Sequence, residues 1–205
     1  MKQYRKLAVF GGTFSPIHNG HLHALLAYAN TVRPDVVYVI PTAVAHKTRE
    51  DTATALQRIE MLRQALANIA LPCPVVISDL EIRRGGKSYT IDTVRELSSL
   101  AEEIVIFCGT DMLFTLEKWR GFRHLISTVS VAYMQREEDC RYQEKVAEKA
   151  AWLSEHYGAE LISLNSVPCE ISSGDVRKAV RNGEDISGMV PESVARYIAT
   201  QGLYT

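Results

Sequence analysis

Residues 7–22 read LAVFGGTFSPIHNGHL, and this stretch says more about the fold than any other part of the chain. Its first four residues form an apolar run that predicts a short buried strand, and a second apolar run from Leu22 to Val32 predicts a helix. Two glycines, a proline and two histidines therefore lie at a strand-to-helix turn, where the amides of the helix start favour an anion. His18 and His21 face the same way at this start, so both imidazoles can reach one bound phosphate.

Outward from this turn, short Val- and Ile-rich runs alternate with longer helical patterns. We expect further strands at 36–40, 75–77, 104–108, 129–134 and 161–164, and helices at 54–69, 90–100 and about 139–156. The 54–69 helix carries Leu56, Ile59, Leu62 and Leu66 at helical spacing. This alternation predicts an α/β fold, a doubly wound parallel sheet covered on both faces, in a single domain over residues 1–205. Ligands bind such sheets beyond the carboxyl ends of the strands.

Composition and charge exclude several other classes of protein. A formal net charge of −1 argues against a general nucleic-acid binder. The cysteines are scattered, with no Cys-x-x-Cys pair, which disfavours structural zinc and fits reduced thiols in a cytosol. The basic start precedes too short an apolar run for a secretion signal, and no run approaches the ~18 residues of a membrane span. We expect a cytoplasmic protein without nucleic-acid or membrane partners; the oligomeric state cannot be deduced from the sequence.

The turn contains the pattern Gly-x-Phe-x-Pro-x-His-x-Gly-His, which resembles the signature of the nucleotidyltransferase superfamily marked by a His-x-Gly-His motif. The fuller form resembles the bacterial nicotinate-nucleotide adenylyltransferases. The resemblance implies a Rossmann-like nucleotidyltransferase fold with a small C-terminal helical part, and phosphate contacts from both histidines. It also implies an ATP site that includes Gly11, Gly12, Thr13, Phe14, His18, Gly20 and His21, with Thr13 and Phe14 shared by the acceptor.

A second motif stands near the other end, where residues 170–178 read EISSGDVRK. Serines ahead of a helical segment with Asp175 in its first turn predict an N-terminal cap, and this alone could explain them. The same helix start can hold a phosphate, with Arg177 projecting from the first turn as a charged donor. The segment resembles the family's Ile-Ser-Ser-x-x-Ile/Val-Arg motif, which implies nucleotide contacts for Ile171, Ser172, Ser173 and Arg177.

A loop after the second strand carries a further cation. The family has a Pro-Pro-His-Lys loop here, whose lysine reaches the triphosphate; His46-Lys47 match it, which implies that role for Lys47. Val44 and Ala45 replace the two prolines, and the loop is less rigid because proline pre-sets the backbone.

Residues between the two motifs resemble the family's acceptor side. The Ser-Tyr-Thr-Ile-Asp-Thr segment implies that Tyr89 and Thr90 line a nicotinate pocket, and the Gly-x-Asp…Trp pattern implies Gly109 and Asp111 near the nucleotide and Trp119 stacked on the ring. A tryptophan is, however, more often a core residue. Arg136 aligns with a substrate-binding arginine, but Glu137 and Glu138 replace the family's Pro-Gly and compete for it.

The resemblance implies transfer of AMP from ATP to nicotinate mononucleotide, giving deamido-NAD and pyrophosphate. Two anions must meet, so the sequence needs cationic and donor groups rather than a covalent nucleophile. We assign that role to His18, His21, Lys47 and Arg177, and expect Mg2+ to arrive with ATP because no carboxylate cage is visible. Neither a P-loop nor a dinucleotide-binding Gly-x-Gly-x-x-Gly is present. The alternatives are another acceptor (nicotinamide mononucleotide or phosphopantetheine), a non-catalytic nucleotide sensor, or a flavodoxin-like binding domain with chance matches.

Overall fold

The computed structural model describes residues 2–43, 53–134, 140–164, 169 and 171–205. The strands are β1 (Tyr4–Gly12), β2 (Val36–Pro41), β3 (Val75–Ile77), β4 (Ala101–Gly109), β5 (Ser130–Met134) and β6 (Leu161–Ser163). The helices are α1 (Asn19–Val32), α2 (Ala55–Leu66), α3 (Leu80–Arg84), α4 (Thr90–Leu97), α5 (Thr110–Leu113), the 3-10 helix η2 (Leu116–Lys118), α6 (Phe122–Ile126), α7 (Cys140–Tyr157), α8 (Ser173–Arg181) and α9 (Glu192–Gln201).

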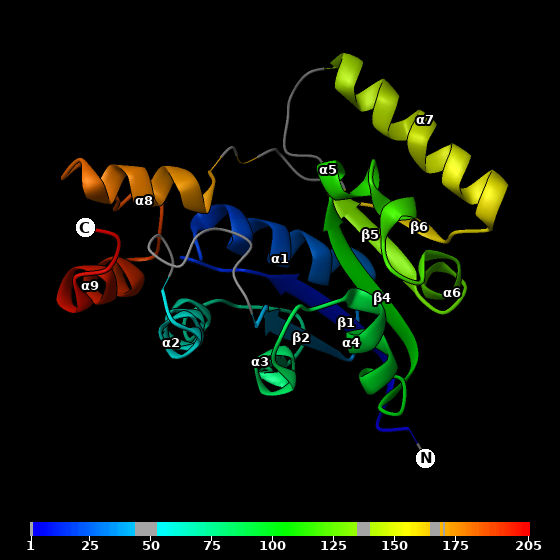
Figure 1. The fold of residues 1–205 in the computed structure, drawn as a ribbon, viewed down its shortest axis with the longest axis horizontal. Helices are drawn as coiled ribbons and strands as arrows, with labels where there is room; N and C mark the ends of the chain where they lie inside the picture. Colours follow the sequence, from blue (N-terminus) through cyan, green and yellow to red (C-terminus); the bar gives the residue numbers. More distant parts are fainter. Residues whose placement is uncertain (1, 44–52, 135–139, 165–168, 170) are drawn as a thin grey trace.

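The strands form one six-stranded sheet in the order β3-β2-β1-β4-β5-β6, and every neighbouring pair is parallel (Figure 1). The chain builds outward from β1 to β3 in one direction and from β4 to β6 in the other. The strand order therefore reverses between β1 and β4. In open parallel sheets this reversal opens a crevice beyond the carboxyl ends of the two central strands, where ligands bind.

Both faces of the sheet are buried, as the predicted doubly wound architecture requires. Ala8 and Phe10 of β1 belong to a core packed with residues of α1, α2, α8 and α9. Leu7 and Val9, which alternate with them, belong to a second core with residues of α4, α5, α6 and α7. Side chains of a strand point alternately to its two faces, so a run that is apolar at every position marks a strand covered on both sides.

All six predicted strands and the longer predicted helices are present, with boundaries that differ by up to three residues: β4 begins at Ala101 rather than 104, α2 ends at Leu66 rather than 69, and α4 ends at Leu97 rather than 100. The differences at the first turn matter most for the site. Gly11 and Gly12 are not turn residues; they end β1, paired with Ile40 and Pro41 of β2. Helix α1 begins at Asn19 rather than Leu22, because His18 caps it. The turn between strand and helix therefore runs from residue 13 to residue 18.

The sequence prediction for the inner face of α2 was wrong at one position. Leu56, which has helical spacing with the core leucines, is 78% exposed, whereas Arg58 is only 2% exposed. The buried stripe of the helix runs through Arg58, Met61, Leu62 and Ala65, so Leu56 lies on the exposed face and an arginine forms part of the buried one. Helices α3, α5 and α6 were not predicted, since they are too short to show a helical period.

The C-terminal helices complete one side of the molecule. Helix α9 packs against α2, and α8 lies beside the start of α1, whereas α7 lies at the opposite end of the sheet beyond β5 and β6 (Figure 1). The start of α1 is tied to this region, because the Asn19 amide donates to Met189 O at 2.8 Å and its side chain donates to Gly188 O at 3.0 Å. None of the described helices combines the length and apolarity that a membrane crossing requires.

Candidate active site

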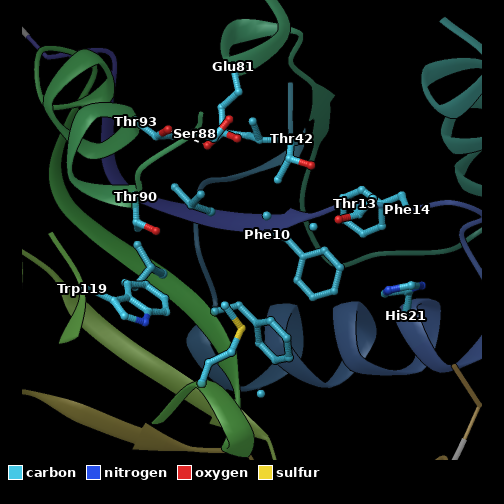
Figure 2. A pocket seen from close by; sticks show the side chains of 18 of the residues that line it. Phe10, Thr13, Phe14, His21, Thr42, Glu81, Ser88, Thr90, Thr93 and Trp119 are labelled. Carbon is cyan, nitrogen blue, oxygen red and sulfur yellow. Dashed lines mark hydrogen bonds between the residues drawn. The ribbon is translucent and has the colours of Figure 1, made fainter. Parts of the chain in front are cut away.

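A cavity of about 390 Å³ opens at the carboxyl ends of β1, β2 and β4, where the strand order reverses. Its size lies within the range of small-molecule sites, about 300–1,000 Å³. It is lined by Val9, Phe10, Gly11, Gly12, Thr13, Phe14, His21, Ile40, Thr42, Glu81, Ser88, Thr90, Thr93, Ile106, Phe107, Gly109, Met112, Trp119 and Ser173. His21 and Trp119 lie at opposite ends, with Phe10 between them and Glu81 and Ser88 on a third side (Figure 2).

The spacing of the two histidines has a local structural cause. His18 is the N-cap of α1 and its Nδ1 accepts a hydrogen bond from the His21 amide, while His21 Nδ1 accepts one from the His18 amide, both at 3.3 Å. This is a reciprocal capping box built from imidazoles. Because both Nδ1 atoms accept, the proton of each neutral ring is on Nε2. The ring centroids of His18 and His21 lie 3.6 Å apart, so the two Nε2–H donors lie close together.

Two glycines of the first motif permit close approaches that a side chain would prevent. A Cβ at Gly12 would lie 2.8 Å from the Phe14 ring, which folds back over the strand end. A Cβ at Gly20 would lie 3.1 Å from His18 Nδ1 and 3.3 Å from the backbone oxygen of Ile171. Gly20 therefore lets the segment before α8 pack directly against the start of α1. The two motifs, far apart in sequence, meet at this glycine.

The carbonyl groups of the turn are held from outside the turn. Thr13 O accepts a hydrogen bond from Arg58 Nη1 at 2.8 Å, and Ser15 O accepts one from Arg177 Nη1 at 2.7 Å. Pro16 O accepts one from Ser173 Oγ at 2.8 Å. Since C=O and N–H point in opposite directions across a planar trans peptide, the contacts to Thr13 O and Pro16 O turn the Phe14 and Ile17 amides away from their protein partners. Pro16, which follows Ser15, has no N–H, so the Arg177 contact holds the backbone without orienting a donor. The carbonyl oxygens of the turn therefore face the interior of the protein. The opposite side of the turn is thereby suited to an anion.

The start of α8 confirms the predicted cap. Ser172 Oγ accepts from the Asp175 amide, and the Asp175 carboxylate accepts from the Ser172 amide at 3.0 Å. Hydrogen bonds from the Ser172 hydroxyl and amide hold the pKa of Asp175 below its usual value. Arg177 differs from expectation: it lies past the first turn, is 7% exposed, and turns inward to Ser15. The helix begins early enough that this position faces the core.

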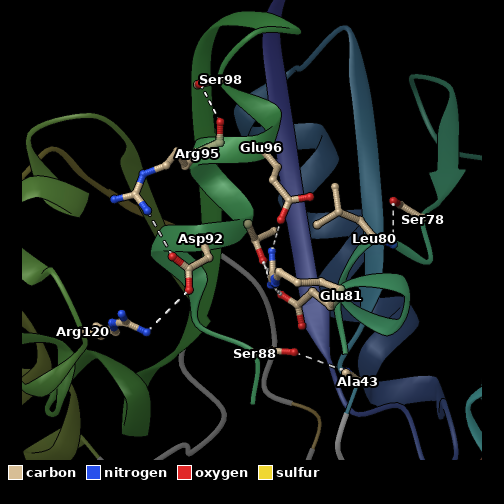
Figure 3. Close-up of polar contacts among 12 residues, drawn as sticks. Ala43, Ser78, Leu80, Glu81, Ser88, Asp92, Arg95, Glu96, Ser98 and Arg120 are labelled. Atoms are coloured by element: carbon tan, nitrogen blue, oxygen red, sulfur yellow. Dashed lines mark hydrogen bonds and ion pairs between the residues drawn. The ribbon is translucent and has the colours of Figure 1, made fainter. Parts of the chain in front are cut away.

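The far end of the cavity is built by α4 and the segment after α5. Thr90 and Trp119 line the cavity itself, whereas Tyr89 lines an adjoining hollow of about 310 Å³ on the other side of Trp119. The Tyr89 ring lies 4.8 Å below the Arg120 guanidinium, which also pairs with Asp92 at 3.9 Å (Figure 3). Trp119 is half-buried between two hollows, which suits a stacking surface better than a core position.

A polar cluster that the sequence analysis missed lies on the third side. Glu81 is 8% exposed; its Oε1 accepts from Thr93 Oγ1 at 2.6 Å, and Thr93 Oγ1 accepts from Arg84 Nη2 at 2.9 Å. Glu81 Oε2 is buried without a hydrogen-bond partner among the described residues. Ser88, nearby, accepts from the Ala43 amide at 3.3 Å (Figure 3). A buried glutamate on a helix of five residues carries no periodic signal. Only the position of Glu81 shortly before the Ser-Tyr-Thr segment in the sequence could have indicated it.

The structure brings together most of the residues expected in the site. Nine of them line the cavity: Gly11, Gly12, Thr13, Phe14, His21, Thr90, Gly109, Trp119 and Ser173. His18, Gly20, Ile171, Ser172 and Arg177 stand behind the turn rather than in the cavity wall, and Asp111 is exposed on α5. Lys47 and Arg136 lie outside the described residues, as do Glu137 and Glu138.

No group of three or more histidine, cysteine, aspartate or glutamate side chains is arranged to hold a metal ion in the described ranges. The polar groups that line the cavity are mainly hydroxyl, imidazole and amide, which are donors to phosphate rather than a cage for a cation.

Comparison with known proteins agrees with this geometry. The cytidylyltransferase-like family model matches residues 9–179. A probable nicotinate-nucleotide adenylyltransferase of Neisseria meningitidis serogroup B is 32% identical over 98% of both chains, and one of Bordetella petrii is 34% identical over 98% of this chain and 99% of its own. The Plasmodium falciparum nicotinic acid mononucleotide adenylyltransferase complexed with NaAD shares the fold, with a TM-score of 0.76, 19% identity and coverage of 98% and 97%. The chain belongs to the cytidylyltransferase-like family, among the nicotinate-nucleotide adenylyltransferases.

Proposed function

We propose that the protein transfers AMP from ATP to nicotinate mononucleotide, giving deamido-NAD and pyrophosphate. The observation that carries this proposal is the shape of the cavity, with the phosphate turn and His21 at one end and Trp119 at the other. The names of the relatives supply the acceptor, because relatives that match the whole length are nicotinate-nucleotide adenylyltransferases. The triphosphate would bind at the turn and the pyridine ring would stack on Trp119.

The reaction needs two anions held in line. An oxygen of the acceptor phosphate attacks the α-phosphorus of ATP, the bond from that phosphorus to the oxygen bridging to the β-phosphate breaks, and pyrophosphate leaves with the electron pair. His21 Nε2–H would donate to the α-phosphate as charge develops, and His18, whose tilted ring lies 3.6 Å from the His21 ring between centroids, would keep that donor in place. Amides of the turn and the start of α8 would hold the outer phosphates, with Lys47 and Arg177 supplying charge. The protein's part is positioning and electrostatic stabilisation, with no covalent intermediate.

We propose that the ion is Mg2+ and that it enters bound to ATP, since the cavity offers donors to phosphate and not a cage. We also propose that the enzyme works in the cytoplasm. In the described part of the chain Cys73, Cys108 and Cys169 are free thiols, as a reducing compartment favours.

The test is product formation with acceptors in parallel. Purified protein is incubated with ATP and Mg2+ together with nicotinate mononucleotide, nicotinamide mononucleotide or phosphopantetheine, and both pyrophosphate and the adenylylated product are quantified. We expect pyrophosphate and deamido-NAD in equal amounts, with nicotinate mononucleotide preferred. Release with phosphopantetheine alone would refute the acceptor, and ATP binding without release from any acceptor would support a nucleotide sensor instead.

One observation favours nicotinamide mononucleotide as a second acceptor worth measuring closely. Glu81 Oε2 lies buried on the cavity wall without a partner in the described residues, and a carboxyl group there would accept from a carboxamide and repel a carboxylate. Arg84, 3.9 Å from Glu81, offsets part of that repulsion. A Glu81→Gln variant should shift the preference further toward the nicotinate form.

A further inference from the structure

Arg58 is a charged side chain in an unusual place. It projects from α2 into the interior, where it is 2% exposed and is the largest fully buried side chain of the described chain. Burial lowers the pKa of its guanidinium, yet arginine keeps its charge at neutral pH. Removing a charge from water is costly unless an opposite charge or a full set of hydrogen bonds replaces the solvent.

The partners of Arg58 are neutral. Its Nη1 donates to Thr13 O and its Nη2 to Thr42 O, each at 2.8 Å, and its Nε is buried without a partner among the described residues. Among the described residues, no carboxylate forms an ion pair with the Arg58 guanidinium. Arg177, the other buried guanidinium behind the turn, donates to the Ser15 carbonyl. Two buried cations therefore lie behind one strand-to-helix turn, and both donate to backbone carbonyl groups.

The two carbonyls that Arg58 joins belong to different walls of the cavity. Thr13 follows β1 and Thr42 follows β2, and both line the cavity. Across the Thr42 peptide the Ala43 amide points the opposite way and donates to Ser88 Oγ, another lining residue. Across the Thr13 peptide the same planarity turns the Phe14 amide away from α2. A flat guanidinium with two parallel donors sets the separation of these walls in a way that a lysine cannot.

We infer that Arg58 is a positioning residue for the nucleotide: it joins the Thr13 and Thr42 walls of the cavity, and the triphosphate supplies the counter-charge that the described residues do not. This inference rests on the proposed ATP site. It predicts that removing the charge weakens binding of the nucleotide, and that keeping the charge without the fork weakens turnover instead.

The experiment measures MgATP binding by titration calorimetry on the full chain, with folding checked by circular dichroism. Arg58→Met should raise the Kd for MgATP about tenfold or more, with a smaller rise for AMP, which carries fewer charges. Arg63→Met is the matched control, since Arg63 lies on the same helix, 66% exposed and paired with Glu60, and should leave the Kd within about twofold. A folded Arg58→Met protein that binds MgATP as tightly as the wild type overturns the inference.

Arg58→Lys separates the two contributions and serves also where the methionine variant does not fold. It should keep the Kd for MgATP within about threefold of the wild type while kcat falls about tenfold, because an ammonium keeps the charge and cannot span both carbonyls. An unchanged kcat overturns the bridging role. Because binding is read without an acceptor, failure of the wild-type protein to form deamido-NAD would refute the proposed function separately.

Discussion

Gly20→Ala tests the junction of the two motifs with the smallest possible perturbation, one methyl group. The added Cβ would lie 3.1 Å from His18 Nδ1, 3.2 Å from His18 Cε1 and 3.3 Å from the Ile171 backbone oxygen. These contacts are several tenths of an ångström too short, so either the imidazole or the segment before α8 must move. The imidazole is the softer neighbour, and its Nδ1 already accepts a long hydrogen bond, 3.3 Å, from the His21 amide.

The magnitudes favour a loss of activity over a loss of fold. Replacing glycine by alanine in a helix gains up to about 1 kcal/mol, whereas overpacking costs about 1–3 kcal/mol and a weakened cap about 1 kcal/mol. The net destabilisation is therefore about 1–3 kcal/mol, which a chain of this size can sustain. A displacement of about 1 Å can cost about a hundredfold in rate, so a shift of half that size at His18 and His21 should cost about tenfold in kcat.

The assay is steady-state pyrophosphate release with saturating MgATP and acceptor, alongside thermal unfolding. Gly188→Ala is the matched control, because a Cβ there meets nothing within 4 Å. We expect the control to keep wild-type kcat and Gly20→Ala to lose about tenfold. Equal kcat in both variants, each folded, would mean that the close approach of the motifs does not matter for chemistry, and the reasoning would be refuted.

Two further predictions concern the cap of α8 and the far end of the cavity. Asp175→Asn should lower Tm by about 2–4 °C at pH 7. Since the pKa of Asp175 is lowered in the folded state, its stabilisation is present above the unfolded-state value near 3.9 and is lost as pH falls through the folded-state value. Thermal unfolding compared at pH 7 and in acid should therefore show the difference between variant and wild type shrink at the lower pH. A constant difference at both pH values would contradict this origin. Trp119→Ala should raise the KM for the acceptor about tenfold or more and leave the KM for ATP within about threefold, and a rise confined to ATP would place the stacking surface elsewhere.

The sequence predicted the sheet because each strand is a run of apolar residues bounded by turns. It predicted the two candidate phosphate-binding motifs, residues 7–22 and 170–178, because the residue types and spacing within each motif are unusual. What it missed depends on contacts between distant segments. Leu56 is apolar and has helical spacing with Ile59, whereas Arg58 is charged, so the sequence pattern favours burial of the leucine. The tertiary contacts of Arg58 to Thr13 and Thr42 account for the burial of the arginine instead.

The sequence predicted which residues lie at the site better than it predicted what each of them contacts. The motif indicated His18 and His21, but the reciprocal cap, in which each imidazole accepts from the other's backbone amide, is visible only in the folded structure. Arg177 was expected to project toward ligand and instead holds the Ser15 carbonyl. Sequence spacing specifies which side of a helix a residue occupies, whereas the direction of a long flexible side chain is set by the partners it meets in the fold.

The measurement that tests the account most directly compares deamido-NAD formation by wild-type protein and by His21→Ala, from MgATP and nicotinate mononucleotide. The account predicts equal yields of deamido-NAD and pyrophosphate from the wild type, and a variant that folds but turns over at least about a hundredfold more slowly, because a preorganised donor to the transition state is gone. No product from the wild type, or a near-normal rate from the variant, would contradict it.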